Sequence, residues 1–255
     1  MKKSLVLSFL VLSLALSFTA YAGTTMTIFS MNLHCGLGDW KGRLDLVINE
    51  ALDSDADVLG FQEVCFNQDV DMTSYILKGL SEGGYEVTYW KTFNTHRSFI
   101  KFHEQLLIIT KHKVLGSEAH MLPSMKGFEN GYLAINLGNV WAVTTHTHFA
   151  LPQIRATQFR TLNSIFKNRN TIMFGDMNSN PKDSETGVLK ENGWISIFGG
   201  PTYPSSNPKS TFDGFWISKS FAQSISGPHF RRLFVNAPVP PSDHLGIELK
   251  FQINR

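Results

Sequence analysis

Asp176 and Asn178 follow a short apolar run, Ile172 to Phe174, and a glycine. Side chains two residues apart in an extended segment face the same way, so a carboxylate and a carboxamide would lie side by side at the end of a buried strand. Hard divalent cations and phosphate oxygens are bound by such groups. The same Gly-Asp-x-Asn pattern also forms an Asx-type turn with no chemical role, and this segment alone leaves both interpretations open.

Similar polar groups recur at the ends of other expected strands. They are Asn32, Glu63, Glu104 (just before a strand), His146 with His148, Asp213, and Asp243 with His244. In α/β architectures the strand ends point into the functional crevice. A carboxylate there, with no basic partner in the local sequence, is costly unless it meets a metal ion, water or a titrating neighbour. The pattern therefore predicts one site built from distant parts of the chain.

Hydrophobic periodicity predicts the elements that must position these residues. The first half alternates strand and helix, and successive strands follow from Glu86. Expected strands are Thr25–Leu33, Asp57–Phe61, Glu86–Phe93, Gln105–Thr110, Val114–Met121, Gly131–Leu137, Val140–Thr147, one from Thr171, and three near 211–218, 229–235 and 245–253. Expected helices are Lys41–Leu52, 71–82, Ile154–Asn168 and a short one after the Thr171 strand. We expect one α/β domain whose sheets mix parallel crossovers with hairpins.

Length and composition fit a single globular domain over residues 23–255, because 255 residues that are 42% hydrophobic can bury one large core. Residues 1–22 are separate. Lys2 and Lys3 precede an apolar run, Leu5 to Phe18, and Ala20-Tyr21-Ala22 follows. This arrangement is typical of a secretory signal peptide, which predicts a secreted or periplasmic mature chain. The alternative is an uncleaved anchor, for which the run is short.

Net charge and cysteine content limit the classes of function that the chain can have. Removing residues 1–22 removes Lys2 and Lys3 and no acidic residue, so the formal net charge falls from +2 to 0. A neutral chain has no global field that attracts polyanions, which disfavours a dedicated duplex-binding protein. Both cysteines, Cys35 and Cys65, lie in the exported part just beyond predicted strand ends, so either a disulfide or two inert buried thiols would fit.

Six short motifs occur in one fixed order. They are Met31-Asn32-Leu33, Phe61-Gln62-Glu63-Val64, Thr145-His146-Thr147, Gly175-Asp176-Met177-Asn178, Thr211-Phe212-Asp213-Gly214-Phe215 and Ser242-Asp243-His244-Leu245. Each is weak alone. Together they resemble the endonuclease/exonuclease/phosphatase superfamily, which includes pancreatic-type deoxyribonucleases, bacterial sphingomyelinases and inositol-phosphate phosphatases. The resemblance implies a four-layer sandwich of two mixed β-sheets flanked by helices, and hydrolysis of phosphate esters with Mg²⁺ or Mn²⁺.

The resemblance also implies roles for individual residues. Glu63 looks like the principal metal carboxylate, with Asn32 beside it at the metal site, orienting the metal or the phosphate. Asp243 matches a further metal or water ligand. Asp176 and Asn178 match the positions that hold the attacking water and the phosphate oxygens. His244 matches a general base or phosphate donor, and Asp213 the carboxylate that orients it.

His146 matches the second catalytic histidine, the proton donor to the leaving oxygen. His148, also preceded by a threonine, lies two residues on and would share its strand face, so it is the alternative candidate for this role. If His146 is the catalytic histidine, His148 is either a phosphate-binding residue or a structural histidine. Glu104 resembles the glutamate that supports the acid histidine in deoxyribonucleases. The run Asp213-Gly214-Phe215-Trp216 departs from the usual pattern. Gly214 would leave room above the site there, and Trp216 would be either core or a substrate platform.

The substrate class stays open between nucleic acid and a phospholipid such as sphingomyelin. The stretch Tyr89 to His103 interleaves aromatic and basic residues that would seat on a lipid surface, stack on bases or fill the core. We expect a monomer, since nothing in the sequence indicates a stable protein partner. A different class, a non-catalytic binding or effector module that keeps only the fold, would be marked by a lost metal carboxylate or histidine, and none is lost.

Overall fold

The computed structural model describes residues 24–35, 38–85, 87–93 and 103–254. The predicted signal peptide lies outside these residues, as does 94–102 of the aromatic and basic stretch. Within the described ranges, no helix combines the length and apolar character needed to cross a membrane.

Twelve strands and five α-helices make up the described chain. The strands are β1 (Thr24–Asn32), β2 (Val58–Phe66), β3 (Val87–Phe93), β4 (His103–Thr110), β5 (Gly116–Leu122), β6 (Asn130–Asn136), β7 (Trp141–His146), β8 (Thr171–Asp176), β9 (Ile195–Ile197), β10 (Asp213–Ile217), β11 (Ile225–Arg232) and β12 (Ile247–Ile253). The helices are α1 (Trp40–Ser54), α2 (Met72–Leu80), α3 (Pro152–Phe166), α4 (Gly187–Glu191) and α5 (Lys219–Ala222), with 3₁₀ turns at Ser81–Gly83 and Ser184–Thr186.

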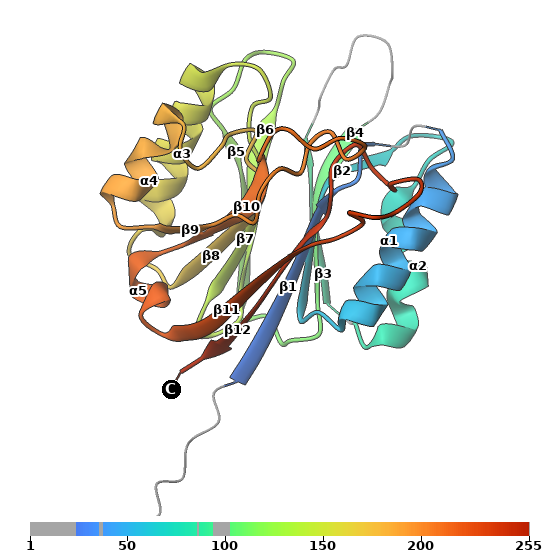
Figure 1. Ribbon diagram of the computed structural model, residues 1–255, viewed down its shortest axis with the longest axis horizontal. Coiled ribbons are helices and arrows are strands. Elements are labelled where there is room, and N and C mark those ends of the chain that lie inside the picture. Colours follow the sequence, from blue (N-terminus) through green and yellow to red (C-terminus); the bar gives the residue numbers. More distant parts are fainter. Residues whose placement is uncertain (1–23, 36–37, 86, 94–102, 255) are drawn as a thin grey trace, which may run out of the picture.

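The strands form two six-stranded sheets packed face to face, in the orders β11-β12-β1-β2-β4-β3 and β5-β6-β7-β8-β10-β9. Among the strand pairs of the described residues, β1 with β2 and β7 with β8 are the parallel ones, so both sheets are mixed. Helices α1 and α2 cover the outer face of the first sheet, and α3 and α4 cover the second (Figure 1). The predicted four-layer sandwich is confirmed.

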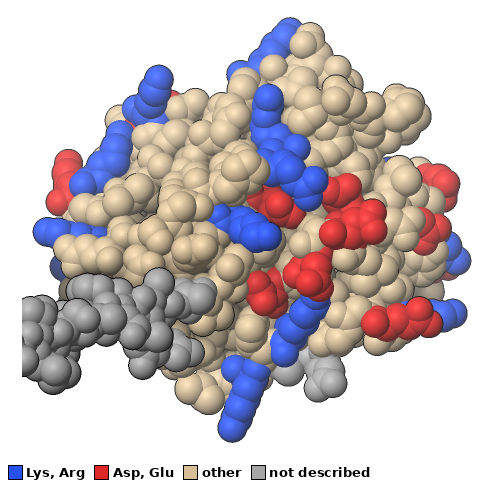
Figure 2. All heavy atoms as spheres, turned by 60° about the horizontal axis from the view of Figure 1, so that its bottom comes forward, with Lys and Arg blue, Asp and Glu red and all other residues tan. Residues whose placement is uncertain are grey.

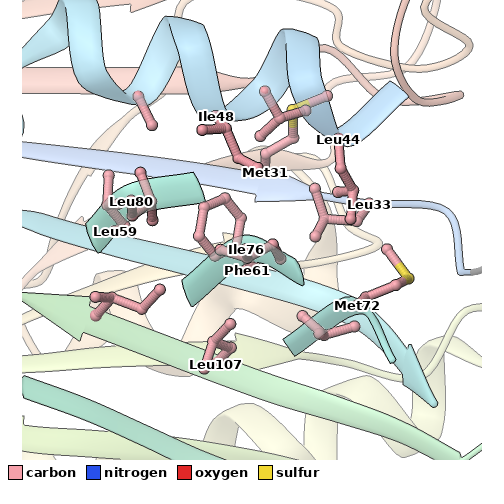
Figure 3. Packing of buried hydrophobic residues seen from close by; sticks show 14 of the residues in the cluster. Met31, Leu33, Leu44, Ile48, Leu59, Phe61, Met72, Ile76, Leu80 and Leu107 are labelled. Atoms are coloured by element: carbon pink, nitrogen blue, oxygen red, sulfur yellow. The ribbon is translucent and has the colours of Figure 1, made fainter. Parts of the chain in front are cut away.

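Apolar side chains fill all three spaces between the layers. Beneath α1 and α2, the periodic residues Leu44, Ile48 and Ile76 meet strand residues such as Phe61 (Figure 3). Between the sheets the contact is close enough that a Cβ on Gly60 would lie 2.2 Å from the Phe174 ring. Dense packing of this kind fixes the relative position of the two sheets, and so of any site built across them.

The predicted elements differ from the structure in a few places. Strand β2 was expected to end at Phe61 but continues to Phe66 through an irregularity between Phe61 and Val64. Strand β11 begins at Ile225 and carries a register shift between Ser226 and His229, which breaks the alternation used to find it. The short elements β9 and α5 lack the length that a periodic pattern needs.

The departure at 213–216 has a structural explanation. Trp216 is fully buried, so of its two predicted roles the structure shows the core role. The expectation that Gly214 leaves room above the site is wrong, because the Phe198 ring fills the space where a Cβ would lie, 2.2 Å away. Glycine is required there by the close approach of an aromatic ring.

Candidate active site

Three of the predicted site residues lie in one row across the second sheet. His146 on β7 pairs with Asp176 on β8, and Asp176 pairs with Asp213 on β10. Directly paired residues present their side chains on the same face of a sheet. Because each residue is at the end of its strand, the row stands at one edge of the sheet, where the first sheet brings Asn32 alongside.

Asp176 is the centre of the site and is only 1% exposed. Its Oδ2 lies 3.5 Å from Nε2 of His146 and 3.6 Å from Nε2 of His244. The same oxygen accepts a 3.0 Å hydrogen bond from the Asn32 amide. Its Oδ1 accepts the backbone N–H of Asn178 at 2.8 Å, so the Asx-type turn is present as well as the convergence of polar groups.

The backbone at this strand end allows no side chain on residue 175. Gly175 has φ 134, and a Cβ there would lie 2.2 Å from the Thr145 carbonyl oxygen. Next to it, Gln62 of the first sheet donates to Thr144 of the second at 2.9 Å and to Ser30 at 3.2 Å. The nitrogen of this buried amide joins the two sheets directly beneath the site through these two hydrogen bonds.

Glu63 reaches the site through a β-bulge. The register of β2 against β4 shifts between Phe61 and Val64, and Glu63 itself has φ 52, in the left-handed region. Bulges turn a side chain away from the regular alternation and are common beside functional sites. The bulge places the Glu63 carboxylate, 7% exposed, on the wall of the cavity described below.

Asn32 bridges the two sheets. Its amide nitrogen donates to Glu63 at 3.2 Å and to Asp176 at 3.0 Å, while its oxygen accepts the backbone N–H of His34 at 2.9 Å. The residue is fully buried and does not line the cavity. The structure therefore places it beneath the site as a support for two carboxylates, whereas the sequence suggested a direct ligand.

His244 and Asp213 form a buried pair. The Asp213 Oδ2 lies 2.8 Å from His244 Nδ1 and accepts the Thr202 hydroxyl at 2.5 Å. Burial lowers the pKa of His244, but the surrounding carboxylates, led by Asp213, outweigh it and raise the pKa to about 10. Burial raises the pKa of Asp213 as well. The pair therefore holds one proton tightly, and the predicted orienting role of Asp213 matches this geometry.

Asp243 lies on the loop before β12, beside His244. Its Oδ2 is 3.0 Å from Nδ1 of His34, a residue that the sequence analysis did not single out. Ser242 stabilises the turn, since its hydroxyl accepts the His244 N–H at 3.2 Å and donates to Asp243 at 3.3 Å. Burial raises the pKa of Asp243, but the hydrogen bond from His34 and the charge of His244 more than offset it and lower the pKa.

These residues surround a cavity of about 510 Å³. It is lined by Glu63, Glu104, His146, Asp176, Asn178, Asp243 and His244 from the predicted set, and by His34, Phe128, Glu129, Asn130, Phe149, Tyr203 and Phe212, which sequence reasoning missed. The missed residues lie at or beyond element ends, where no periodic pattern marks them. The aromatic ones form two pairs, Phe128 with Phe149 at 5.7 Å and Tyr203 with Phe212 at 5.6 Å between ring centroids.

His146 and His148 have different surroundings. His146 lines the cavity and meets Asp176. His148 is 2% exposed, and its Nδ1 accepts the backbone N–H groups of Ala150 and Leu151, both at 3.1 Å, just before α3. Burial, followed by the charge of Arg155, lowers the pKa of His148. The geometry favours His146 as the site residue and His148 as the structural histidine.

The remaining predicted residues are also placed near the site. Glu104, at the start of β4, is 7% exposed and lines the cavity together with His146, and its role as a support for that histidine stays a prediction. Asn178 has φ 45 and turns back toward β7, where its amide donates to the Thr147 carbonyl at 3.0 Å. Cys35 and Cys65 form a disulfide, so of the two alternatives for the cysteines the structure has the bridge.

The donor set fits a hard divalent cation. The carboxylates of Glu63, Asp176 and Asp243 line one cavity, and oxygen ligands of this kind bind Mg²⁺ and Mn²⁺. Asp176, Asp213 and His244 also bring ligand atoms within 4.8 Å of one another. In that group, however, His244 and Asp213 already bond each other. The cavity wall is therefore the better place for an ion.

The face of the molecule shown in Figure 2 carries charged side chains of both signs, and the basic and acidic side chains are intermixed on it. Several are paired, as in Arg231 with Glu248 at 3.0 Å and Arg169 with Glu118 at 2.7 Å. Such pairs neutralise each other locally, in agreement with the small net charge.

The fold and the site together define a class of protein: a two-sheet sandwich whose strand ends carry two histidines and several carboxylates around one cavity. The family model for the endonuclease/exonuclease/phosphatase family matches residues 29–244, and the chain belongs to this family. Members of the family are hydrolases that act on phosphodiesters.

Solved structures share the fold at low sequence identity. An endonuclease/exonuclease/phosphatase from Beutenbergia cavernae is 15% identical with a TM-score of 0.73, and the match covers 90% of this chain and 72% of that one. The human nocturnin catalytic domain is 18% identical with a TM-score of 0.65, over 90% and 95%. Beta toxin from Staphylococcus aureus is 17% identical with a TM-score of 0.65, over 88% and 99%. No curated protein sequence matches this chain.

Proposed function

We propose that the protein is an exported, Mg²⁺- or Mn²⁺-dependent phosphodiesterase that works as a monomer on a nucleic acid or a phospholipid head group. One observation carries the proposal: His146 and His244 approach the same buried carboxylate oxygen of Asp176, at 3.5 and 3.6 Å, on the wall of a cavity rich in carboxylates. Hydrolysis of a phosphodiester needs proton donors, a proton acceptor for the attacking water and neutralisation of the charge on the phosphoryl oxygens, all at one point.

The residues divide the chemistry among them. Asp176 accepts a hydrogen bond from the attacking water and takes up its proton as the water oxygen bonds to phosphorus. His146 donates a proton to the leaving oxygen as its bond to phosphorus breaks. His244, which holds its proton at neutral pH, donates to a phosphoryl oxygen, and Asp213 keeps its ring in place.

A divalent cation would be held by Glu63 and Asp243, with Asn32 fixing the Glu63 carboxylate from beneath. When bound, the ion supplies positive charge to the phosphoryl oxygens. Without it, the carboxylates on the cavity wall would repel a phosphate, which is the physical reason to expect a cation requirement.

The substrate range follows from the walls of the cavity and from export. The signal-like segment 1–22 supports secretion or periplasmic localisation. The neutral net charge of residues 23–255 disfavours a duplex that is bound mainly through its phosphates. The paired aromatic rings at the cavity would accept either a base or the apolar part of a lipid.

The test is hydrolysis of plasmid DNA, sphingomyelin vesicles and inositol phosphates, each with Mg²⁺ and with EDTA. We expect turnover of one substrate class that EDTA abolishes and added Mg²⁺ restores. Glu63→Gln should be inactive, and the control Glu82→Gln, an exposed glutamate outside the cavity, should match the wild type. Full turnover in excess EDTA would refute the proposal. Absence of turnover on all three would favour the alternative, a non-catalytic binding or effector module.

A further inference from the structure

The segment that follows β1 is held in an unusual conformation beside the cavity. His34 and Cys35 have φ values of 52 and 43, in the left-handed region that residues other than glycine rarely adopt. Strain of this kind persists only where surrounding contacts enforce it, and it clusters at functional sites. The question is therefore which contacts enforce it and what they position.

Two anchors hold the segment. The disulfide joins Cys35 to Cys65, two residues after Glu63, with the Cα atoms 5.0 Å apart. The Arg43 guanidinium donates to the carbonyls of Leu33 at 3.0 Å and Cys35 at 2.9 Å. The same group donates to the Pro241 carbonyl at 2.6 Å, which ties the segment to the loop that carries Asp243.

Between these anchors the His34 side chain faces the site. Its Nδ1 lies 3.0 Å from Asp243 Oδ2, and both side chains are 34% exposed on the cavity wall. Its backbone N–H donates to Asn32, whose amide in turn contacts Glu63 and Asp176. His34 therefore connects the loop that carries Asp243, through Asn32, to the carboxylates of Glu63 and Asp176.

We propose that His34, held in place by the Cys35–Cys65 disulfide and by Arg43, is a positioning residue that fixes the Asp243 carboxylate for binding of the divalent cation. The inference deepens the proposed function and rests on it. Asp243 lies on a loop and is partly exposed, so without His34 its carboxylate would keep only the 3.3 Å hydrogen bond from Ser242 and would sample more rotamers. Partners that orient metal-binding carboxylates typically change metal affinity or activity about 10- to 100-fold when they are mutated.

The experiment measures Mn²⁺ binding by isothermal titration calorimetry without substrate, and melting temperature by circular dichroism. His34→Ala should weaken Mn²⁺ binding about 10- to 100-fold with little change in melting temperature. His34→Asn should keep affinity near the wild-type value, because its amide nitrogen can take the place of Nδ1. His34→Gln, whose amide reaches the position of Nε2, should resemble His34→Ala.

The disulfide is tested by a cycle with Cys35→Ala/Cys65→Ala. If the bridge acts through His34, adding His34→Ala to the cysteine variant should cause little further loss of Mn²⁺ affinity. If the losses of Mn²⁺ affinity in the cysteine variant and in His34→Ala add fully, the bridge does not act through His34. If the cysteine variant does not fold, the Mn²⁺ affinities of the three His34 variants test the role of His34 by themselves.

The two hypotheses fail differently. If the wild type binds Mn²⁺ and His34→Ala binds it equally well, the positioning role is overturned and the proposed function stands. If the wild type binds no Mn²⁺ and hydrolyses none of the substrates, both are overturned.

Discussion

His146 and His148 are two residues apart, yet the structure predicts opposite consequences for their removal. His146→Ala removes the group that would protonate the leaving oxygen, so kcat should fall about 10²- to 10⁴-fold. The ring is at the cavity wall with its side chain 16% exposed, and Asp176 keeps other partners, so the melting temperature should change little.

His148→Ala should instead destabilise the fold. The Nδ1 atom accepts two backbone N–H groups at 3.1 Å with one lone pair, and this shared hydrogen bond is worth about 1 kcal/mol. The ring also stacks on Phe149 with the rings 5° from parallel, worth about 1 kcal/mol more. The total of about 2 kcal/mol corresponds to a lower melting temperature by about 4–8 °C in a protein of this size.

The assay pairs thermal unfolding by circular dichroism with steady-state kinetics on the substrate found in the first screen. His148→Asn is the matched control, because its side-chain oxygen can accept the same N–H groups and should recover much of the stability. Loss of activity in His148→Ala at an unchanged melting temperature, with His146→Ala still active, would contradict both assignments.

Three further substitutions test other features of the structure. Gly175→Ala should cost about 3 kcal/mol or more of unfolding free energy by chemical denaturation, because its Cβ would collide with the Thr145 carbonyl and φ is 134. Asn32→Ala should reduce Mn²⁺ affinity about 10-fold or more in calorimetry, because two buried carboxylates lose their shared donor. Burial raises the pKa of Glu185, but its bonds to Arg155 outweigh it and hold that pKa below the usual value. This contribution to stability is present above pH about 4.3 and lost as pH falls through the lowered pKa. Glu185→Gln should thus unfold about 2 kcal/mol more easily at pH 7. The difference from the wild type should close as pH falls through the lowered pKa, and a difference independent of pH would contradict the assignment.

Much of this architecture is visible in the sequence, because the strands that build it carry long periodic patterns. The apolar run Ile172 to Phe174 predicts β8, and the row with His146 and Asp213 follows from strand ends that carry polar groups. The family resemblance adds the fixed order of the six motifs, which hydrophobic periodicity alone does not provide.

The parts that sequence reasoning missed depend on contacts between distant residues. His34 became a site residue only through its distance to Asp243, and its type alone gives no such indication. The bulge at Glu63 leaves no local signature, since Phe-Gln-Glu-Val continues an ordinary strand pattern. Asn32 was predicted at the metal or the phosphate, and its contacts with Glu63 and Asp176 beneath the cavity could not be predicted, because burial and hydrogen-bond partners are not encoded in spacing.

The row of His146, Asp176 and Asp213 has a consequence for how this chain can vary. Surface turns away from the cavity can lengthen or shorten without disturbing the row, since none of them sets which residues stand opposite one another. A single residue inserted or deleted inside β8 would instead send the Asp176 carboxylate through to the other side of the sheet and separate it from both histidines. Natural or engineered length changes in a working enzyme should therefore be confined to the turns.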